Sequence, residues 1–129
     1  PTLNELKGAT EKYFAKLGAG YRAKYLENVL KELEDFNIEE SKNLPTEELR
    51  NKLISLSGVG PKVADCILLF GYSRLDVFPV DTWIEKMYNQ FYENCSNRNV
   101  IRQKLVEEFG NLSGYAQQYL FYYKRSYLK

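Results

Sequence analysis

Apolar residues recur along this chain at the three-to-four-residue spacing of helices, and no segment shows the strict alternation of a strand. In the stretch 21–36, for example, the pattern places four apolar side chains on one stripe: Tyr25, Val29, Leu33 and Phe36. Glycines, prolines and capping residues separate such segments. The pattern predicts helices at 10–17, 21–36, 46–56, 61–71, 82–92, from 97 or 99 to 110, and 113–127. We therefore expect an all-α helical bundle, folded as a single domain over residues 1–129.

Composition limits the classes of function. The 129 residues are 44% hydrophobic, which suits one buried core, and no apolar run reaches membrane-spanning length. The chain has two cysteines, Cys66 and Cys95, and no histidine, which disfavours a disulfide framework, a zinc site and a four-cysteine iron–sulfur cluster. The first residues do not resemble a signal peptide, so we expect an intracellular protein with no membrane partner.

Charge is unevenly distributed although the net charge is only +1. Acidic residues crowd the stretch 27–48, whereas basic residues precede it between 7 and 24 and recur at the end of the chain. One face could therefore meet an anion while another repels it.

The segment Gly58-Val59-Gly60 is predicted to turn the chain between two helices. Two glycines allow backbone conformations closed to other residues, and they leave N–H groups bare at a helix N-terminus, where a phosphate can be held. By itself, Gly-x-Gly is more often a plain tight turn. The preceding Leu-x-x-Leu and the following Pro61-Lys-Val-Ala-Asp-Cys66 make it specific. A phosphate contact here would fix register on a nucleic acid without reading its bases.

Two side chains carry candidate chemistry. Lys62 is predicted just inside a helix that Pro61 begins, where the positive end of the helix dipole favours a neutral, nucleophilic amine. Asp81 lies at the predicted head of the next long helix. Each alone has a plain structural alternative: a solvated surface lysine, and a helix cap aided by a Thr82-x-x-Glu85 capping box.

Three separated motifs resemble one family. The block from Leu53 to Trp83 resembles the helix-hairpin-helix plus Gly/Pro-Asp signature of DNA glycosylases, in the form found in the 8-oxoguanine DNA glycosylase branch. The segment Lys16-Leu-Gly-Ala-Gly-Tyr-Arg-Ala-Lys-Tyr25 is similar to the part of that branch that reaches into the duplex. The segment Gly114-Tyr-Ala-Gln-Gln-Tyr-Leu-Phe121 is similar to its final pocket helix. The resemblance spans residues 3–125.

The resemblance implies excision of 8-oxoguanine from double-stranded DNA during base-excision repair. It implies a bifunctional DNA glycosylase and abasic-site lyase that is a monomer, needs no cofactor or catalytic metal, and works in the cytoplasm, nucleoid or nucleus. Lys62 matches the lysine that attacks the sugar C1′, forming a Schiff base that permits strand cleavage by β-elimination. Asp81 matches the aspartate that stays anionic and stabilises positive charge on the sugar.

The resemblance also implies a pocket for the damaged base. Cys66 lies one helical turn beyond Lys62, and Gln117 and Phe121 share a face of the last helix. Cys66 and Phe121 would sandwich the extruded guanine, and Gln117 would hydrogen-bond its Watson–Crick edge. Packing in the core is the ordinary alternative for these residue types. Five tyrosines of the same helix are expected to be core and surface residues: Tyr115, Tyr119, Tyr122, Tyr123 and Tyr127.

Contacts to DNA follow from the same resemblance. Tyr21 and Arg22 match residues that wedge into the duplex and contact the base opposite the lesion, with local packing of Tyr21 as the alternative. Four hairpin residues would hold a phosphate: Gly58, Val59, Gly60 and Pro61. A monovalent cation would lie on three carbonyls of the same turn: Ile54, Leu56 and Val59.

The chain departs from the family in two respects. Trp83 stands where some relatives carry a histidine that contacts a backbone phosphate. The resemblance also begins partway through the family's sequence, without its β-rich N-terminal domain, so we expect a C-terminal fragment of a larger enzyme.

Two other classes of function stay open: a non-catalytic helix-hairpin-helix DNA-binding module, and a structural helical domain. Within the superfamily, the missing cysteines disfavour an iron–sulfur relative, and Lys62 disfavours an adenine-excising one.

Overall fold

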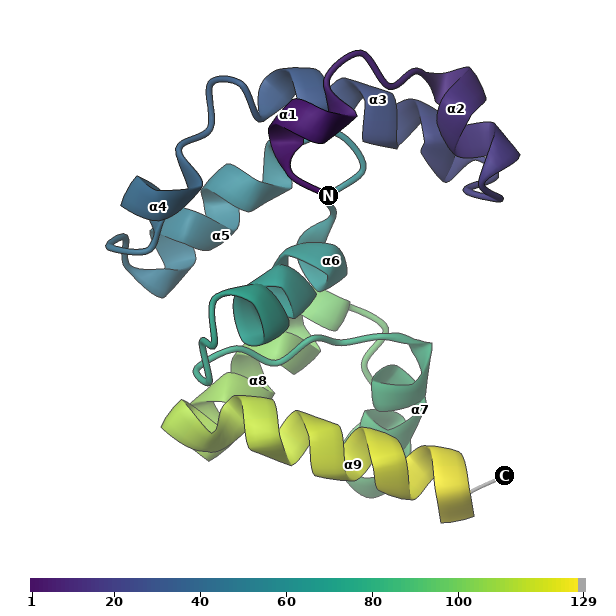
Figure 1. Cartoon of the computed structure of the whole chain (residues 1–129). Helices are drawn as coiled ribbons and strands as arrows, with labels where there is room; N and C mark the ends of the chain where they lie inside the picture. The colour runs from purple at the N-terminus through teal and green to yellow at the C-terminus, as the bar shows by residue number, and fades with distance from the viewer. Residues whose placement is uncertain (128–129) are drawn as a thin grey trace. The chain divides into compact units, whose positions relative to one another are not determined.

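The computed structural model describes residues 1–127 of the chain (Figure 1). All regular elements in this range are helical, which confirms the all-α prediction. The chain divides into two compact units, Pro1–Gly60 and a second unit that begins at Pro61. The expectation of a single domain stays a prediction.

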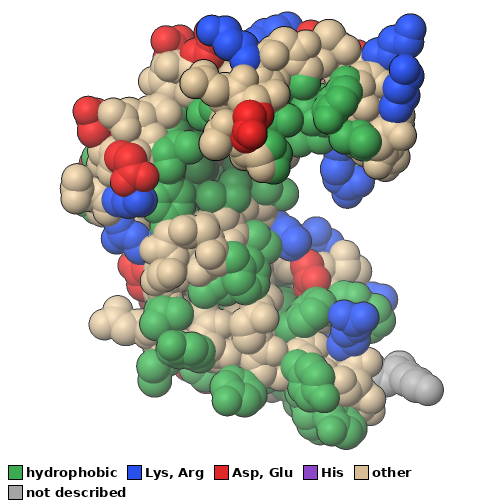
Figure 2. Space-filling model, in the orientation of Figure 1, with side chains coloured by type: hydrophobic (Ala, Val, Ile, Leu, Met, Phe, Trp, Pro, Cys, Tyr) green, Lys and Arg blue, Asp and Glu red, His purple; other side chains and the backbone are tan. Residues whose placement is uncertain are grey.

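The first unit contains five helices: α1 Leu3–Leu6, α2 Glu11–Lys16, α3 Arg22–Glu32, α4 Ile38–Ser41 and α5 Thr46–Ile54. Helices α2 and α3 pack against each other across the predicted glycine corner. Gly18 and Gly20 have φ values of +84° and +56° there, which other residues rarely adopt. Lys and Arg side chains gather around the α2 end of this unit, and acidic side chains gather near α4 (Figure 2).

The hydrophobic pattern did not predict α1 or α4, and it placed the end of α3 too late. Thr2 and Glu5 form a capping box at α1, and Asn37 caps α4 by accepting two backbone N–H bonds. Helix α3 ends at Glu32 rather than at Phe36, and the N–H groups of residues 34–36 bond to carbonyls three positions back. Three acidic residues lie there, at the negative end of the helix dipole, which disfavours further helix: Glu32, Glu34 and Asp35.

The second unit contains α6 Pro61–Cys66, a π-helical segment Ile67–Gly71, α7 Thr82–Phe91, α8 Arg98–Phe109, a 3₁₀ turn Gly110–Leu112 and α9 Ser113–Tyr127. Helices α7, α8 and α9 pack against one another (Figure 1). Their shared core is apolar and buried: Phe78, Val80, Ile84, Met87, Tyr88, Ile101 and Leu105. Phe78 and Val80 of this core belong to the buried, non-helical segment 77–80, which leads directly into Asp81.

The predicted helix 61–71 is helical throughout but changes type at Ile67. The wider π turn shifts which side chains face inward. Ala64, Leu68 and Leu69 are buried, whereas Val63 and Phe70 are 40% and 64% exposed. All five tyrosines of α9 are exposed, so the expectation that some belong to the core is wrong.

No helix within residues 1–127 combines the length and the apolarity needed to cross a membrane.

Candidate active site and nucleic-acid interface

Lys62 lies in the first turn of α6, one residue after Pro61 begins the helix. Its side chain is exposed and makes no hydrogen bond or ion pair in the described part of the chain. In the free protein, Lys62 is therefore a solvated surface lysine, as the structural alternative expected. An amine with no partner is also available to react with an incoming electrophile.

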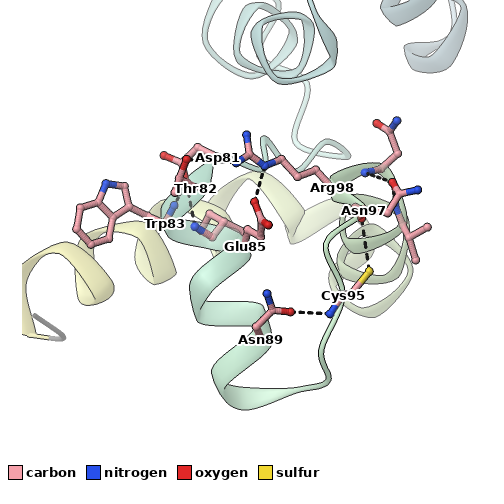
Figure 3. Close-up of polar contacts among 11 residues, drawn as sticks. Asp81, Thr82, Trp83, Glu85, Asn89, Cys95, Asn97 and Arg98 are labelled. Atoms are coloured by element: carbon pink, nitrogen blue, oxygen red, sulfur yellow. Dashed lines mark hydrogen bonds and ion pairs between the residues drawn. The ribbon is translucent and has the colours of Figure 1, made fainter.

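Asp81 is the N-cap of α7, as the structural alternative expected (Figure 3). Its Oδ1 atom accepts the backbone N–H groups of Trp83 and Ile84, each at 2.9 Å. The second carboxylate oxygen accepts no hydrogen bond within residues 1–127. Capping with one oxygen fixes the carboxylate and leaves the other available to a developing positive charge. The cap and the predicted catalytic role are therefore compatible.

The first turn of α7 differs from the predicted capping box. Thr82 is inside the helix rather than at its cap, and Glu85 binds Arg98 instead (Figure 3). The Arg98 Nε donates to Glu85 at 2.6 Å, and its Nη2 donates to Thr82 at 3.3 Å. The box was wrong because Asp81, one residue earlier, provides the capping oxygen. Trp83 is 43% exposed, and the Lys86 Nζ lies 5.5 Å from its ring centroid.

The predicted pocket residues occupy different environments in the second unit. Gln117 is 5% exposed and donates a hydrogen bond to the Pro79 carbonyl at 3.3 Å. Phe121 is half-buried against the core of this unit, and Cys66 is half-buried as a free thiol at the end of α6. In the free protein, Phe121 therefore packs against the core and Gln117 is a buried hydrogen-bond donor. Their role around a flipped base stays a prediction.

The hairpin is a tight turn in which few N–H groups remain free. Val59 donates to the Leu56 carbonyl at 3.1 Å, and Ser57 donates to Glu32. The N–H groups of Gly58 and Gly60 donate no hydrogen bond within the described residues. Two N–H groups without a partner suit an anion, and the phosphate contact at the hairpin stays a prediction. The cation on the carbonyls of Ile54, Leu56 and Val59 stays a prediction.

Tyr21 and Arg22 lie at the start of α3 in the first unit. Tyr21 is 73% exposed, and the Arg22 Cζ lies 4.5 Å from the centroid of its ring. The ring meets Tyr25 edge-on at 6.5 Å. An exposed aromatic supported from one side, with a cation above it, suits insertion between bases.

Sequence reasoning missed a buried ion pair. The Asp65 carboxylate accepts from the Arg102 Nε at 2.9 Å, and Asp65 is 1% exposed. This pair joins α6, which carries Lys62, to α8. No local pattern indicates this pair, because its partners lie 37 residues apart along the chain.

Two cavities lie in the first unit, away from the predicted catalytic and pocket residues. One cavity of about 550 Å³ lies in the first unit, and its lining includes Leu3, Lys7, Glu27 and Leu30. Another of about 230 Å³ is lined by residues that include Phe36, Ser41 and Leu44. Neither contains a predicted catalytic or pocket residue. Within residues 1–127, no cluster of three or more Cys, Asp or Glu side chains could hold a metal ion.

Solved structures match this chain closely. A Clostridium acetobutylicum 8-oxoguanine glycosylase/lyase in complex with double-stranded DNA is 44% identical over 97% of the chain, with a TM-score of 0.92. MBOgg1 in complex with a low-affinity DNA ligand is 37% identical over the whole chain, with a TM-score of 0.93. This chain shares sequence and fold with the 8-oxoguanine glycosylase/lyases. The resemblance seen in the sequence is confirmed.

Curated relatives lead to the same group of enzymes. A probable N-glycosylase/DNA lyase of Methanothermobacter thermautotrophicus is 40% identical over 113 aligned positions, and the alignment covers 84% of this chain. The N-glycosylase/DNA lyase of Saccharomyces cerevisiae is 30% identical over 94% of this chain. No family model matches the chain. The chain spans 35% of the first of these glycosylase/lyases and 42% of the second, less than half of either.

Proposed function

We propose that this chain carries the Schiff-base site of a bifunctional DNA glycosylase and abasic-site lyase that excises 8-oxoguanine. The proposal is supported by the hydrogen bonding of two side chains in a fold shared with glycosylase/lyases. Lys62 has a free amine, and Asp81 is an anchored carboxylate with one free oxygen. A nucleophile and a fixed anion are the two groups that displacement at a sugar C1′ requires.

Lys62 and Asp81 together provide the groups needed for base excision and strand cleavage. The Lys62 amine forms a bond to C1′ while the C1′–N bond to the base breaks, and the base leaves with the bonding electrons and takes up a proton. Opening of the sugar ring gives a Schiff base between Lys62 and C1′. Loss of a proton from C2′ then expels the 3′ phosphate and cleaves the strand. Asp81 stabilises the positive charge that grows on the sugar during the first step.

The proposed partner is double-stranded DNA that contains oxidised guanine. The free N–H groups of Gly58 and Gly60 would bind a backbone phosphate, and Tyr21 with Arg22 would fill the gap in the duplex. Cys66, Gln117 and Phe121 would surround the flipped base. Such an enzyme works where DNA is kept, in the cytoplasm and nucleoid or in a nucleus.

Borohydride trapping tests this proposal. Reduction converts a Schiff base into a stable covalent adduct, so the full-length protein and its Lys62→Gln variant are incubated with duplexes that contain an abasic site or 8-oxoguanine opposite cytosine. We expect adducts with the unmodified protein and none with the variant. Trapping only on the abasic duplex would restrict the proposal to the lyase step.

A non-catalytic DNA-binding module is the second candidate, and the free hairpin N–H groups favour it independently of Lys62. It predicts duplex binding that weakens as salt rises, with no adduct in any trapping reaction. Absence of salt-sensitive binding would leave a structural helical domain.

A further inference from the structure

The last residue of α3 is bonded to the hairpin. Both carboxylate oxygens of Glu32 accept from Ser57: Oε2 from the backbone N–H at 2.7 Å and Oε1 from the hydroxyl at 2.5 Å. Ser57 directly precedes Gly58. Two bonds to one residue fix the direction of the Ser57 peptide as well as its position. Hydrogen bonds to a charged acceptor are also stronger than those between neutral groups.

A second contact joins the same helix to the same turn. Gly58 has a φ of +76°, and a Cβ atom added there would lie 2.7 Å from the Cβ of Tyr25. The hairpin backbone therefore lies directly against Tyr25, one turn from the start of α3. The Tyr25 ring in turn supports Tyr21 edge-on.

These contacts place two predicted DNA-binding features on one helix. Tyr21 and Arg22 lie at the N-terminal end of α3, and Glu32 at its C-terminal end is bonded to the hairpin. The eleven residues of α3 form a rod of about 16 Å, at about 1.5 Å per residue. Glu32 is hydrogen-bonded to the hairpin at one end of α3, and Tyr25 packs against it near the other end. These two contacts limit movement of the hairpin relative to Tyr21 and Arg22.

Building on the proposed function, we propose that Glu32 is a positioning residue that holds the hairpin on α3, so that the hairpin and the Tyr21–Arg22 pair meet the duplex as one preformed element. Preformed elements bind more tightly because less conformational freedom is lost on binding. Glu32 also occupies the Ser57 N–H, which leaves Gly58 and Gly60 as the hairpin groups free for a phosphate.

Loss of the Glu32 carboxylate should change DNA affinity in opposite directions, depending on whether its charge or its hydrogen bonds to Ser57 matter more. Removing a carboxylate from a DNA-binding protein reduces repulsion of the phosphates and should strengthen binding. Loss of the positioning bonds should weaken it. Glu34→Ala is the matched control, because Glu34 lies two residues away and its side chain makes no hydrogen bond or ion pair in the described residues.

The experiment measures affinity of the full-length protein for a duplex that contains a stable abasic-site analogue, well below the unfolding temperature. We expect Glu32→Ala to bind about tenfold more weakly than Glu34→Ala. Glu32→Gln should recover much of this loss, since a glutamine can accept the Ser57 N–H and donate to the hydroxyl. Ser57→Ala should add little to Glu32→Ala, because both changes break the same contact.

Kinetics separate positioning from a general structural role. On an abasic duplex we expect Glu32→Ala to raise KM and leave kcat within about twofold of the unmodified protein. A lower kcat at unchanged KM would overturn the proposal, and so would equal affinities of Glu32→Ala and Glu34→Ala. Failure of the unmodified protein to form an adduct would contradict the proposed function alone. Failure of the unmodified protein to bind any duplex would overturn both.

Discussion

The Gln117 side chain donates a hydrogen bond to the Pro79 carbonyl at 3.3 Å, and both residues are buried. Pro79 lies two residues before Asp81, so this bond ties α9 to the segment that positions the candidate catalytic carboxylate. The same amide is the group that we expect to read a flipped base. In the free protein it holds the backbone next to Asp81.

Gln117→Leu tests this bond. The leucine fills the space but leaves a buried carbonyl without its donor, so we expect a loss of about 1–3 kcal/mol in the free energy of unfolding. Gln118→Leu is the control, because it removes the hydrogen bond that the exposed Gln118 Nε2 donates to the Gln117 Oε1 and leaves the bond from Gln117 to Pro79 intact. Urea unfolding of both variants measures the difference. Equal stabilities would contradict the importance of the Gln117 bond.

Gly58 and Gly60 should respond differently to alanine. At Gly58 the positive φ costs about 1–2 kcal/mol for a residue with a Cβ, and the contact with Tyr25 adds to that cost. Gly60 has no positive φ, and no atom lies within 4 Å of an added Cβ. We therefore expect Gly58→Ala to lower the free energy of unfolding by at least that amount, and Gly60→Ala to leave it nearly unchanged. A comparable loss at both positions would contradict the hairpin geometry.

The buried pair between Asp65 and Arg102 should matter more than the exposed pairs. Asp65→Ala removes the carboxylate that pairs with the Arg102 side chain, which is only 12% exposed. We therefore expect the free energy of unfolding to fall by about 3–5 kcal/mol. Lys31→Ala breaks a pair with Glu27 in which the lysine side chain is 70% exposed, and it should cost below about 1 kcal/mol. Thermal and chemical unfolding of the two variants provides the comparison. A similar small loss in both would show that the Asp65 pair is not a major contributor.

Acid should weaken the contact between Glu32 and the hairpin. The hydrogen bonds from the Ser57 hydroxyl and backbone N–H hold the pKa of Glu32 below its ordinary value of 4.5. Because the folded-state pKa is lowered, the carboxylate stabilises the fold above its unfolded pKa, and this stabilisation is lost as pH falls through the folded pKa. The stability advantage over Glu32→Gln should therefore be present at pH 7 and smaller at pH 3.

The control for this pH series is Glu34→Gln, which removes a carboxylate from the same end of α3 without touching the hairpin. An advantage over Glu32→Gln that stayed constant from pH 7 to pH 3 would be inconsistent with an ionised Glu32 bonded to Ser57.

Local sequence signals predicted most of the fold. Asp81 and Asn97 cap helices where the capping preference places them, and Pro61 begins α6. The short helices α1 and α4 were missed although Thr2 with Glu5 and Asn37 carry the same kinds of signal, because four-residue segments are too short for a hydrophobic period. The π-helical segment was missed because apolar residues occupy nearly every position from Ile67 to Phe70, so periodicity could not select a face.

The candidate site was only partly predictable for a related reason. The sequence placed Lys62 and Asp81 at helix starts, and the structure has them there. It could not show that Asp81 keeps one oxygen free, or that Glu32 bonds to Ser57 across 25 residues of chain. Contacts between distant segments depend on tertiary packing, which local patterns do not encode.

Mapping the trapped adduct tests the central claim most directly. The full-length protein is reduced with borohydride on an abasic duplex and digested, and the modified peptide is identified by mass spectrometry. We expect the adduct on Lys62, with trapping abolished in Lys62→Gln and retained in Lys86→Gln, a lysine of the same unit that lies over Trp83. An adduct on another lysine, or full trapping by Lys62→Gln, would contradict the assignment of Lys62 as the nucleophile.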